Sequence, residues 1–467
     1  MTEREQSTVS KYKLVGPSDS GEVSDLLADL DEKESKHRLQ ALIAEWLRME
    51  NLVVLTGAGT SVSSGGKRMD DLENTVLETV KAMEDLPVGA AAIIEARQNQ
   101  KEEEKIGFED WLSFLVNAHH LGAAPCSLFD GIRWNLTTEP SQDDLSSLID
   151  RIGKAIFAEC ALSLPETPSF AAGLAADIPP HLSFLAKLVA RDSNLGRAHL
   201  FTLNYDTLFE QAMETLGIQY FDGFTGRADA RFDPSIYGLD IYYPGEVSEG
   251  RVRRFDKFIH FYKLHGSIHW QVRADEMRAR HPDLQRFKGY LSTNDPAEKA
   301  RWLAKHKGSI SAIGILPTAN KFVQTLAMPF AHLFRLFQIR LASPQTFLLV
   351  LGYGFGDDHV TRIIETALMN PSLVMLVVEP NPYSETIERV RRYKDLGKRA
   401  FVLTPTEAAF EEANKANKGK LTYATFDDFS HSIMPDVQWL DDFLRLRRFE
   451  KQIAAESGAK TKRDDGA

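Results

Sequence analysis

The sequence predicts an α/β fold built on a doubly wound, mostly parallel, Rossmann-like sheet with a large helical insertion. Several short apolar runs end in glycines or short polar side chains, as buried parallel strands commonly do. Segments with helical spacing of apolar residues alternate with such runs between 330 and 378. About 140 residues separate the first two runs, which is too many for one crossover and predicts an inserted helical subdomain.

The first apolar run, 52–56, leads directly into a glycine-rich turn. Glycines let a backbone approach a pyrophosphate closely, and the N-terminus of a following helix attracts its charge. A bare tight turn is the alternative interpretation. The sequence does not match a Walker loop, because Ser61 stands where its first glycine belongs and Arg68 follows Lys67. An ordinary dehydrogenase is disfavoured, because Val62 replaces the third glycine of that fingerprint.

Three later apolar runs end in comparable residues. Asn204 and Asp206 follow the second run, and His265 follows the third. A stretch with three glycines and two aspartates, 352–358, follows the fourth. Open parallel α/β sheets bind ligands where such strands end, so we expect the four ends to form one nucleotide site.

The motifs Gly-Ala-Gly-Thr-Ser, Asn-Tyr-Asp, Leu-His-Gly-Ser and Gly-Tyr-Gly-Phe-Gly-Asp-Asp occur in this order between Leu52 and Asn381. Together they resemble the sirtuin-like NAD-consuming superfamily, especially its bacterial branch found in antiphage defence. The resemblance implies that Asn204, Asp206 and His265 match the essential asparagine, aspartate and histidine of sirtuins. Leu203 departs from the pattern, which has glutamine there, and this puts the polar network around the ribose in doubt.

The chemistry of these three side chains suits cleavage between nicotinamide and ribose. Departure of neutral nicotinamide leaves an oxocarbenium-like ribose, so the site must orient water and tolerate positive charge. Asn204 can hold the water, Asp206 can bind ribose hydroxyls and stabilise the cation, and His265 can accept a proton at neutral pH. A structural helix cap is the alternative role for Asn204 and for Asp206.

The expected NAD-binding residues form two groups. The first turn should face the pyrophosphate through Gly57, Ala58, Gly59, Thr60 and Ser61. The adenosine half should be surrounded by Gly352, Tyr353, Gly354 and Phe355, with Glu379 and Asn381. Asp357 and Asp358 are interpreted as caps of the following helix, and His260 and His269 as structural residues.

Composition narrows the function classes. The chain has 467 residues and a formal net charge of -11, so direct binding to nucleic acid or anionic lipid is not expected. Its two cysteines, Cys126 and Cys160, exclude a disulfide framework and favour a reducing compartment. The resembled deacylating sirtuins hold a structural zinc with four cysteines, so we expect no zinc and no other metal. Loss of that zinc module favours hydrolysis of NAD over deacylation.

The chain is expected to divide into a flexible polar arm over 1–33, a sirtuin-like NAD-binding domain over 34–405 with a helical insertion over 70–195, a mainly helical C-terminal extension over 406–454 and a disordered tail over 455–467. Insertion helices are predicted near 74–83, 108–119, 145–162 and 182–192. Residues 271–310 look charged and helical, 310–316 look like a strand, and 439–444 look like one face of a terminal helix. The absence of a membrane-length apolar segment or signal peptide predicts a cytoplasmic protein.

The resemblance also implies a biological role. An unrestrained NAD hydrolase would kill its host, so a gated effector that depletes NAD during infection is expected. One relative pairs a stand-alone sirtuin-like subunit with a HerA-family DNA-translocating ATPase, and the compact layout here suits that arrangement. We therefore expect a homo-oligomer with such an ATPase partner. The alternatives are a non-catalytic sensor of NAD or ADP-ribose, and a sirtuin-like subunit that accompanies a nucleic-acid-guided protein.

Overall fold

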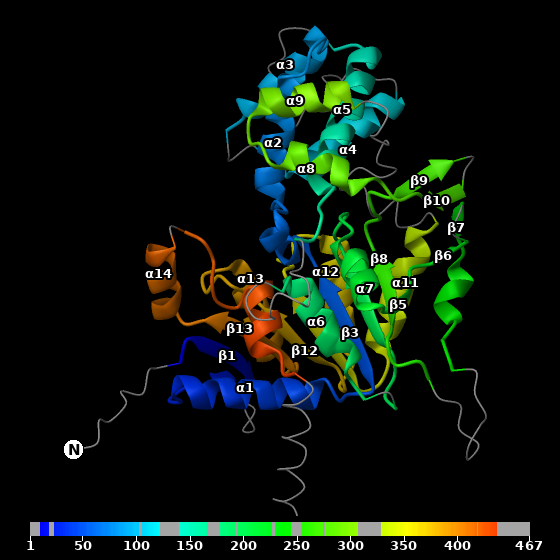
Figure 1. Cartoon of the computed structure of the whole chain (residues 1–467). Helices are drawn as coiled ribbons and strands as arrows, with labels where there is room; N and C mark the ends of the chain where they lie inside the picture. Colours follow the sequence, from blue (N-terminus) through cyan, green and yellow to red (C-terminus); the bar gives the residue numbers. More distant parts are fainter. Residues whose placement is uncertain are drawn as a thin grey trace, which may run out of the picture.

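The structure, a computed structural model, describes residues 10–17, 23–101, 105–121, 140–165, 178–192, 194–226, 229–243, 254–273, 276–306, 328–417 and 419–436. These segments form a central α/β body, a helical lobe beyond one end of its sheet, and a small antiparallel sheet at its side (Figure 1).

A nine-stranded sheet runs through the central body in the order β2-β1-β13-β12-β11-β3-β4-β8-β5. All neighbouring pairs from β13 to β5 are parallel. The strands are β1 (Tyr12–Pro17), β2 (Val23–Asp25), β3 (Asn51–Thr56), β4 (Ala198–Thr202), β5 (Gln219–Phe221), β8 (Phe258–Lys263), β11 (Thr346–Leu351), β12 (Val374–Val378) and β13 (Ala400–Pro405). All residues of β4, β8, β11, β12 and β13 are buried, which explains their mostly apolar sequences. The predicted doubly wound, Rossmann-like fold is confirmed.

The N-terminal edge of the sheet corrects the expectation of a flexible arm over 1–33. β1 pairs antiparallel with β13, with Tyr12 opposite Pro405, and β2 pairs antiparallel with β1. The Tyr12 hydroxyl donates a hydrogen bond to the Asp428 carboxylate at 2.8 Å. β1 buries only alternate residues and therefore has one polar face. This polar content makes the composition of the segment similar to that of a disordered one, which explains the wrong prediction.

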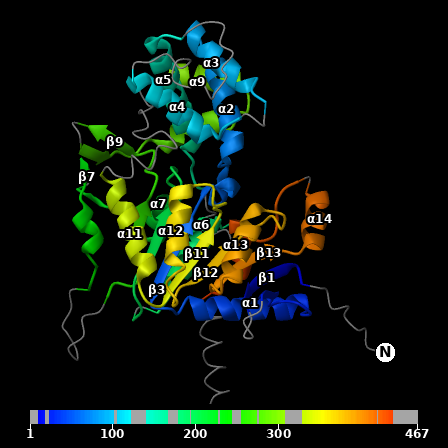
Figure 2. The same cartoon turned by 180° about the vertical axis from the view of Figure 1, so that it is seen from behind.

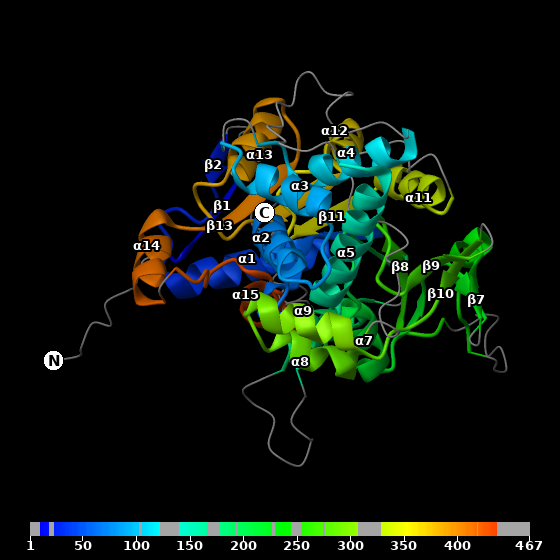
Figure 3. The ribbon, with the colours of Figure 1, turned by 90° about the horizontal axis from the view of Figure 1, so that it is seen from above.

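Helices cover both faces of the sheet (Figure 3). One face carries α1 (Glu32–Trp46), α6 (Pro180–Val189) and α7 (Leu208–Leu216), and the other carries α11 (Phe330–Ala342), α12 (Asp358–Ala367) and α13 (Glu385–Asp395). Successive strand residues alternate between the two cores, as Val54 packs in the first and Val53 in the second. After β13 come α14 (Glu407–Ala416), α15 (Phe426–Asp428) and a π-helical turn, Phe429–Ile433.

The helical lobe comprises α2 (Met69–Lys81), α3 (Val88–Gln98), α4 (Phe108–Leu121), α5 (Gln142–Cys160), α8 (Lys288–Leu291) and α9 (Pro296–Lys305). Figures 1 and 2 show it standing beyond the carboxyl ends of the central strands. The insertion expected over 70–195 supplies α2 to α5, and its helix α3 was not predicted. α6 belongs instead to the central body, where Phe184 and Leu185 join the first core. α8 and α9 come from the segment after β8, outside the predicted insertion. They belong to the lobe because their Tyr290 and Leu303 pack in its apolar core.

The side sheet is antiparallel and has the order β6-β7-β10-β9. Its strands are β6 (Phe224–Thr225), β7 (Ala230–Phe232), β9 (Trp270–Arg273) and β10 (Glu276–Ala279). The prediction that 271–310 is helical is therefore wrong for β9 and β10, whose charged side chains lie on exposed or half-buried strands. The strand predicted at 310–316, the helix face at 439–444 and the tail over 455–467 lie outside the described residues. No helix within the described segments has the length and apolar character needed to cross a membrane.

Candidate functional site

The four motif-bearing strands are neighbours in the sheet, in the order β11-β3-β4-β8. Their carboxyl ends are level, because Thr56 pairs with both Leu351 and Thr202, and Thr202 pairs with Lys263. Strand order changes direction here, since the chain goes from β3 outward to β4 and β8 and then returns to β11 on the other side. This is the switch point at which doubly wound sheets bind ligands.

A cavity of about 330 Å³ opens at these strand ends. Its walls come from the four strand-end motifs and from the near end of the helical lobe. The lining residues that the sequence had singled out are Gly57, Ala58, Ser61, Asn204, Asp206, His265, Gly352, Tyr353, Gly354 and Asp357. The size and concave form match those of small-molecule sites in proteins.

The glycines of the first turn are required by close backbone packing against the turn after β11. A Cβ atom on Gly57 would lie 2.7 Å from the Gly352 carbonyl oxygen, and one on Gly59 would lie 2.6 Å from Gly352 Cα. Gly352 has a φ of 63°, which a residue with a side chain rarely adopts. These glycines therefore allow the turns after β3 and β11 to pack closely together, and this requirement does not depend on a bound ligand.

Asn204 fixes the first turn through its amide nitrogen. That nitrogen lies 3.0 Å from the Gly57 carbonyl oxygen, 3.1 Å from Thr60 Oγ1 and 2.9 Å from Ser61 Oγ. Within the described segments, the Asn204 carbonyl oxygen accepts no hydrogen bond. Asn204 is 8% exposed and lines the cavity, so this oxygen can accept a hydrogen bond from a ligand or water.

Asp206 also holds the site together. One carboxylate oxygen accepts a hydrogen bond from Ser61 Oγ at 2.6 Å, and the other accepts one from the Leu208 N–H at 3.0 Å. The second bond satisfies a backbone donor at the start of α7, as a helix cap does. Asp206 thus has a structural role, and it also places a carboxylate at the cavity wall.

His265 follows β8 and is buried at the cavity wall. Its Nε2 lies 3.1 Å from His359 Nε2 and 4.0 Å from an Asp357 carboxylate oxygen. Asp357 is the residue before α12 and His359 lies in the first turn of that helix. The side chain of Asp357 makes no capping hydrogen bond to α12, so the cap role expected for it is not seen.

The other predicted binding residues lie away from the cavity wall. Thr60 is fully buried and its hydroxyl donates to the Gly57 carbonyl at 2.8 Å. Phe355 has a φ of 59° and packs against Tyr353, with ring centroids 5.1 Å apart. Glu379 and Asn381 form a local turn, in which the Asn381 N–H donates to Glu379 Oε1 at 3.0 Å. Gly59 serves the backbone packing described above.

This side of the cavity has further lining residues to which the sequence analysis gave no role in the site, among them Lys67, Glu109, Glu159 and Cys160. Glu159 is almost fully buried, 3.1 Å from Lys67 Nζ, and forms a second, shorter ion pair with Lys299 of α9. No sequence motif predicts this cluster of Glu159, Lys67 and Lys299, because the three residues are far apart in the chain. Burial raises the pKa of the Cys160 thiol far above its usual range, which disfavours the thiolate form.

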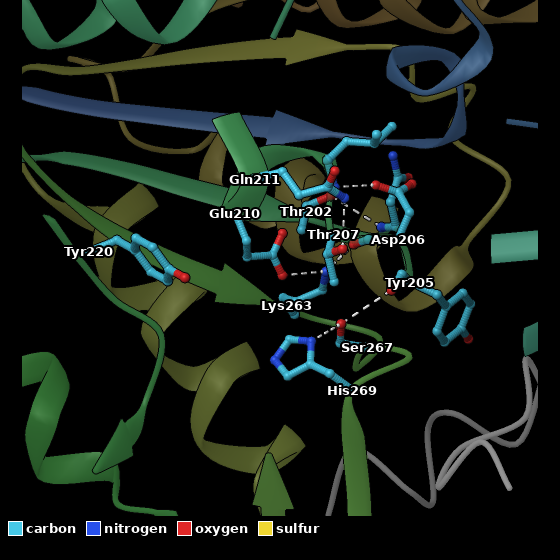
Figure 4. Close-up of polar contacts among 12 residues, drawn as sticks. Thr202, Tyr205, Asp206, Thr207, Glu210, Gln211, Tyr220, Lys263, Ser267 and His269 are labelled. Carbon is cyan, nitrogen blue, oxygen red and sulfur yellow. Dashed lines mark hydrogen bonds and ion pairs between the residues drawn. The ribbon is translucent and has the colours of Figure 1, made fainter. Parts of the chain in front are cut away.

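Beneath the cavity, Lys263 at the end of β8 is held between two acceptors (Figure 4). Its Nζ lies 2.9 Å from Glu210 Oε1 of α7 and also donates to the Asp206 carbonyl. Burial raises the pKa of Glu210 to about 7 against the lowering effect of Lys263. Nearby, Ser267 Oγ donates to the Tyr205 carbonyl at 3.1 Å and lies 2.7 Å from His269 Nδ1. His269 therefore supports the loop after β8.

Residues 198–398 match the family model described as SIR2-like domain. The matched range contains the strand ends that carry Asn204, Asp206, His265 and Gly352, and the match supports a sirtuin-like protein. SIR2-like domains are often NAD-dependent enzymes, and the match suggests an NAD-related function. No curated protein matches the chain.

Proposed function

We propose that this protein is an NAD⁺ hydrolase that releases nicotinamide and ADP-ribose from NAD bound in the strand-end cavity. The observation that carries the proposal is the convergence of Asn204, Asp206 and His265 on one cavity beside two glycine turns. The SIR2-like match over 198–398 supports the same substrate.

In the proposed mechanism, nicotinamide leaves as a neutral pyridine and positive charge develops on the ribose. The Asn204 amide nitrogen is bound to the turn, so its carbonyl oxygen is the atom that accepts a hydrogen bond from the attacking water. Asp206 stabilises the cation mainly through its charge, because both of its oxygens already accept hydrogen bonds within the protein. His265 accepts the proton from water or from a ribose hydroxyl.

The test is chromatography of NAD incubated with the purified protein, with Asn204→Ala and His265→Ala beside the wild type. We expect nicotinamide and ADP-ribose from the wild type and a loss of at least about 100-fold in each variant, as general acid–base groups commonly contribute. His37→Ala, an exposed histidine on α1, is the matched control and should retain activity. Equal NAD loss in the wild type and both site variants would contradict the assignment.

The resemblance to defence proteins extends the proposal to a gated effector that depletes cellular NAD, in a homo-oligomer with a HerA-family ATPase partner. Gating is required because free NAD hydrolysis would be toxic to the host. A steep dependence of activity on protein concentration, or activation by the ATPase, would support assembly as the gate. A strict monomer in size-exclusion chromatography, with and without the ATPase, would argue against it.

A further inference from the structure

The side chains of His265, Asp357 and His359 bring two imidazoles and one carboxylate together at the cavity wall. One ligand-type atom from each lies within 4.8 Å of the others. The two histidine Nε2 atoms are 3.1 Å apart, and Asp357 Oδ1 is 4.0 Å from His265 Nε2. The lack of a cysteine module in the sequence predicted no metal; from these three residues we propose instead that the protein binds a divalent transition-metal ion, such as Zn²⁺, at this position.

The distances suit such an ion. Two nitrogens bound tetrahedrally to zinc at about 2.0–2.1 Å lie about 3.3 Å apart, close to the separation found here. The Asp357 oxygen lies within 4.8 Å of both nitrogens and must move closer to complete the third bond, which a side-chain rotation can supply. Two imidazoles and one carboxylate are the ligand set of many sites for divalent transition metals, whereas Mg²⁺ and Ca²⁺ prefer oxygen ligands throughout.

The surrounding contacts hold two of the three ligand residues, Asp357 and His359. The Tyr353 hydroxyl donates to the Asp357 carbonyl at 3.1 Å and lies 3.2 Å from the Asp357 N–H, which fixes the backbone of that residue. The His359 ring packs edge-on against Phe334, with centroids 5.2 Å apart. His265 and Asp357 line the cavity, so a water or ligand oxygen can take the fourth position.

A metal here has a consequence for the proposed hydrolysis. A bound ion takes the Nε2 lone pair of His265, so the same atom cannot accept a proton. We therefore expect metal binding to slow NAD hydrolysis, and removal of the metal to restore the rate. This consequence rests on the proposed function, whereas metal binding itself does not.

The test is titration of the metal-free full-length protein with Co²⁺, followed by its visible absorption bands, with competition by Zn²⁺. We expect one tight equivalent in the wild type and an affinity at least about tenfold weaker in His359→Ala and in Asp357→Ala. His431→Ala is the matched control, because His431 also lies beside an aspartate, 3.1 Å from Asp427, but on the exposed surface. It should bind the full equivalent.

Absence of a stoichiometric Co²⁺ site in the wild type, or equal affinity in all variants, would overturn the metal site. NAD consumption is measured separately in the presence of a chelator and of Zn²⁺. A protein that binds Co²⁺ but consumes no NAD, either alone or with the ATPase partner, retains the metal site and refutes the proposed hydrolase. A protein that consumes NAD equally with Zn²⁺ bound refutes the inhibition by metal.

Discussion

At the scale of single residues, Asn204 and Asp206 each stabilise the first turn and also line the cavity. Both side chains hold Ser61 in place, so the turn and the proposed chemistry depend on the same hydrogen bonds. Replacing either residue will therefore disturb the turn as well as the reaction. The Asn204→Ala experiment needs a check that the variant remains folded, which circular dichroism supplies.

Because the turn at Gly59 packs closely against Gly352, we predict that a side chain at position 59 lowers the stability of the fold. In Gly59→Ala, the new Cβ would lie 2.6 Å from Gly352 Cα, and the backbone must shift to accommodate it. We expect a loss of about 1–3 kcal/mol in the free energy of unfolding, the usual cost of overpacking. Chemical denaturation measures it.

Gly356→Ala is the matched control for that experiment. It belongs to the neighbouring glycine-rich turn, but a Cβ there meets no atom within 4 Å. Its stability should stay within about 0.5 kcal/mol of the wild type, as for most unconstrained surface changes. Equal losses in the two variants would show that close backbone packing is not what requires Gly59.

The sequence predicted which strand ends lie together, but it did not predict the contacts between them. A glycine, asparagine or histidine after an apolar run is visible in one short window, and parallel strands bring such windows to the same edge. The partners are not visible, since Asn204 and Ser61 are 143 residues apart and His265 and His359 are 94 apart. Glu379 and Asn381 were expected at the site because they follow a strand, but their turn is satisfied locally.

At the scale of elements, the helical lobe is joined to the cavity by the Glu159 ion-pair cluster. Glu159 lies at the end of α5, Lys299 on α9, and Lys67 before α2. The Lys299 ammonium also lies 4.5 Å from the centre of the Tyr290 ring on α8. Local spacing predicted most lobe helices separately, but it could not show that α8 and α9 complete the core begun by α2 to α5. That assembly depends on contacts between segments more than 120 residues apart, such as Glu159 with Lys299.

Loss of the Glu159 charge is predicted to destabilise the lobe. Glu159→Gln leaves the buried Lys299 ammonium without its carboxylate, and breaking such a pair typically costs about 3–5 kcal/mol. We expect a lower melting temperature in calorimetry. Asp150→Asn is the matched control on the same helix, because Asp150 pairs with Lys154 at the exposed surface, where pairs contribute about 0.5 kcal/mol or less. A Glu159→Gln variant as stable as Asp150→Asn would show that the cluster does not hold the lobe.

At the scale of the whole molecule, several histidines are buried in the layers that hold the central sheet together. His181 packs edge-on between Phe209 and Phe426, with ring centroids 4.8 and 5.0 Å away. Neither of its ring nitrogens has a hydrogen-bond partner among the residues that the structure describes. Burial lowers the pKa of His181 from 6.5 to about 4, and it also lowers the pKa values of His199, His260 and His269.

Buried neutral histidines make the fold sensitive to acid. Between pH 6.5 and about 4, His181 is protonated in the unfolded chain but neutral in the native state, so the unfolded state binds more protons. The free energy of unfolding therefore falls as the pH is lowered through this window. His181 alone should account for a loss of about 2 kcal/mol between pH 7.5 and pH 5. Glu210 acts in the opposite direction, because burial raises its pKa to about 7 and the native state takes up its proton first.

Comparing the pH dependence of stability between the wild type and a His181 variant separates the effect of His181 from the opposite effect of Glu210. His181→Phe keeps an aromatic ring between Phe209 and Phe426 but has no proton to gain. Urea denaturation at pH 7.5 and pH 5 should show that this variant loses about 2 kcal/mol less than the wild type on acidification. His37→Phe, at an exposed position of α1, should follow the wild-type dependence. Parallel pH dependences in His181→Phe and the wild type would mean that His181 is charged or solvated in the folded protein, and that the acid sensitivity of the fold originates elsewhere.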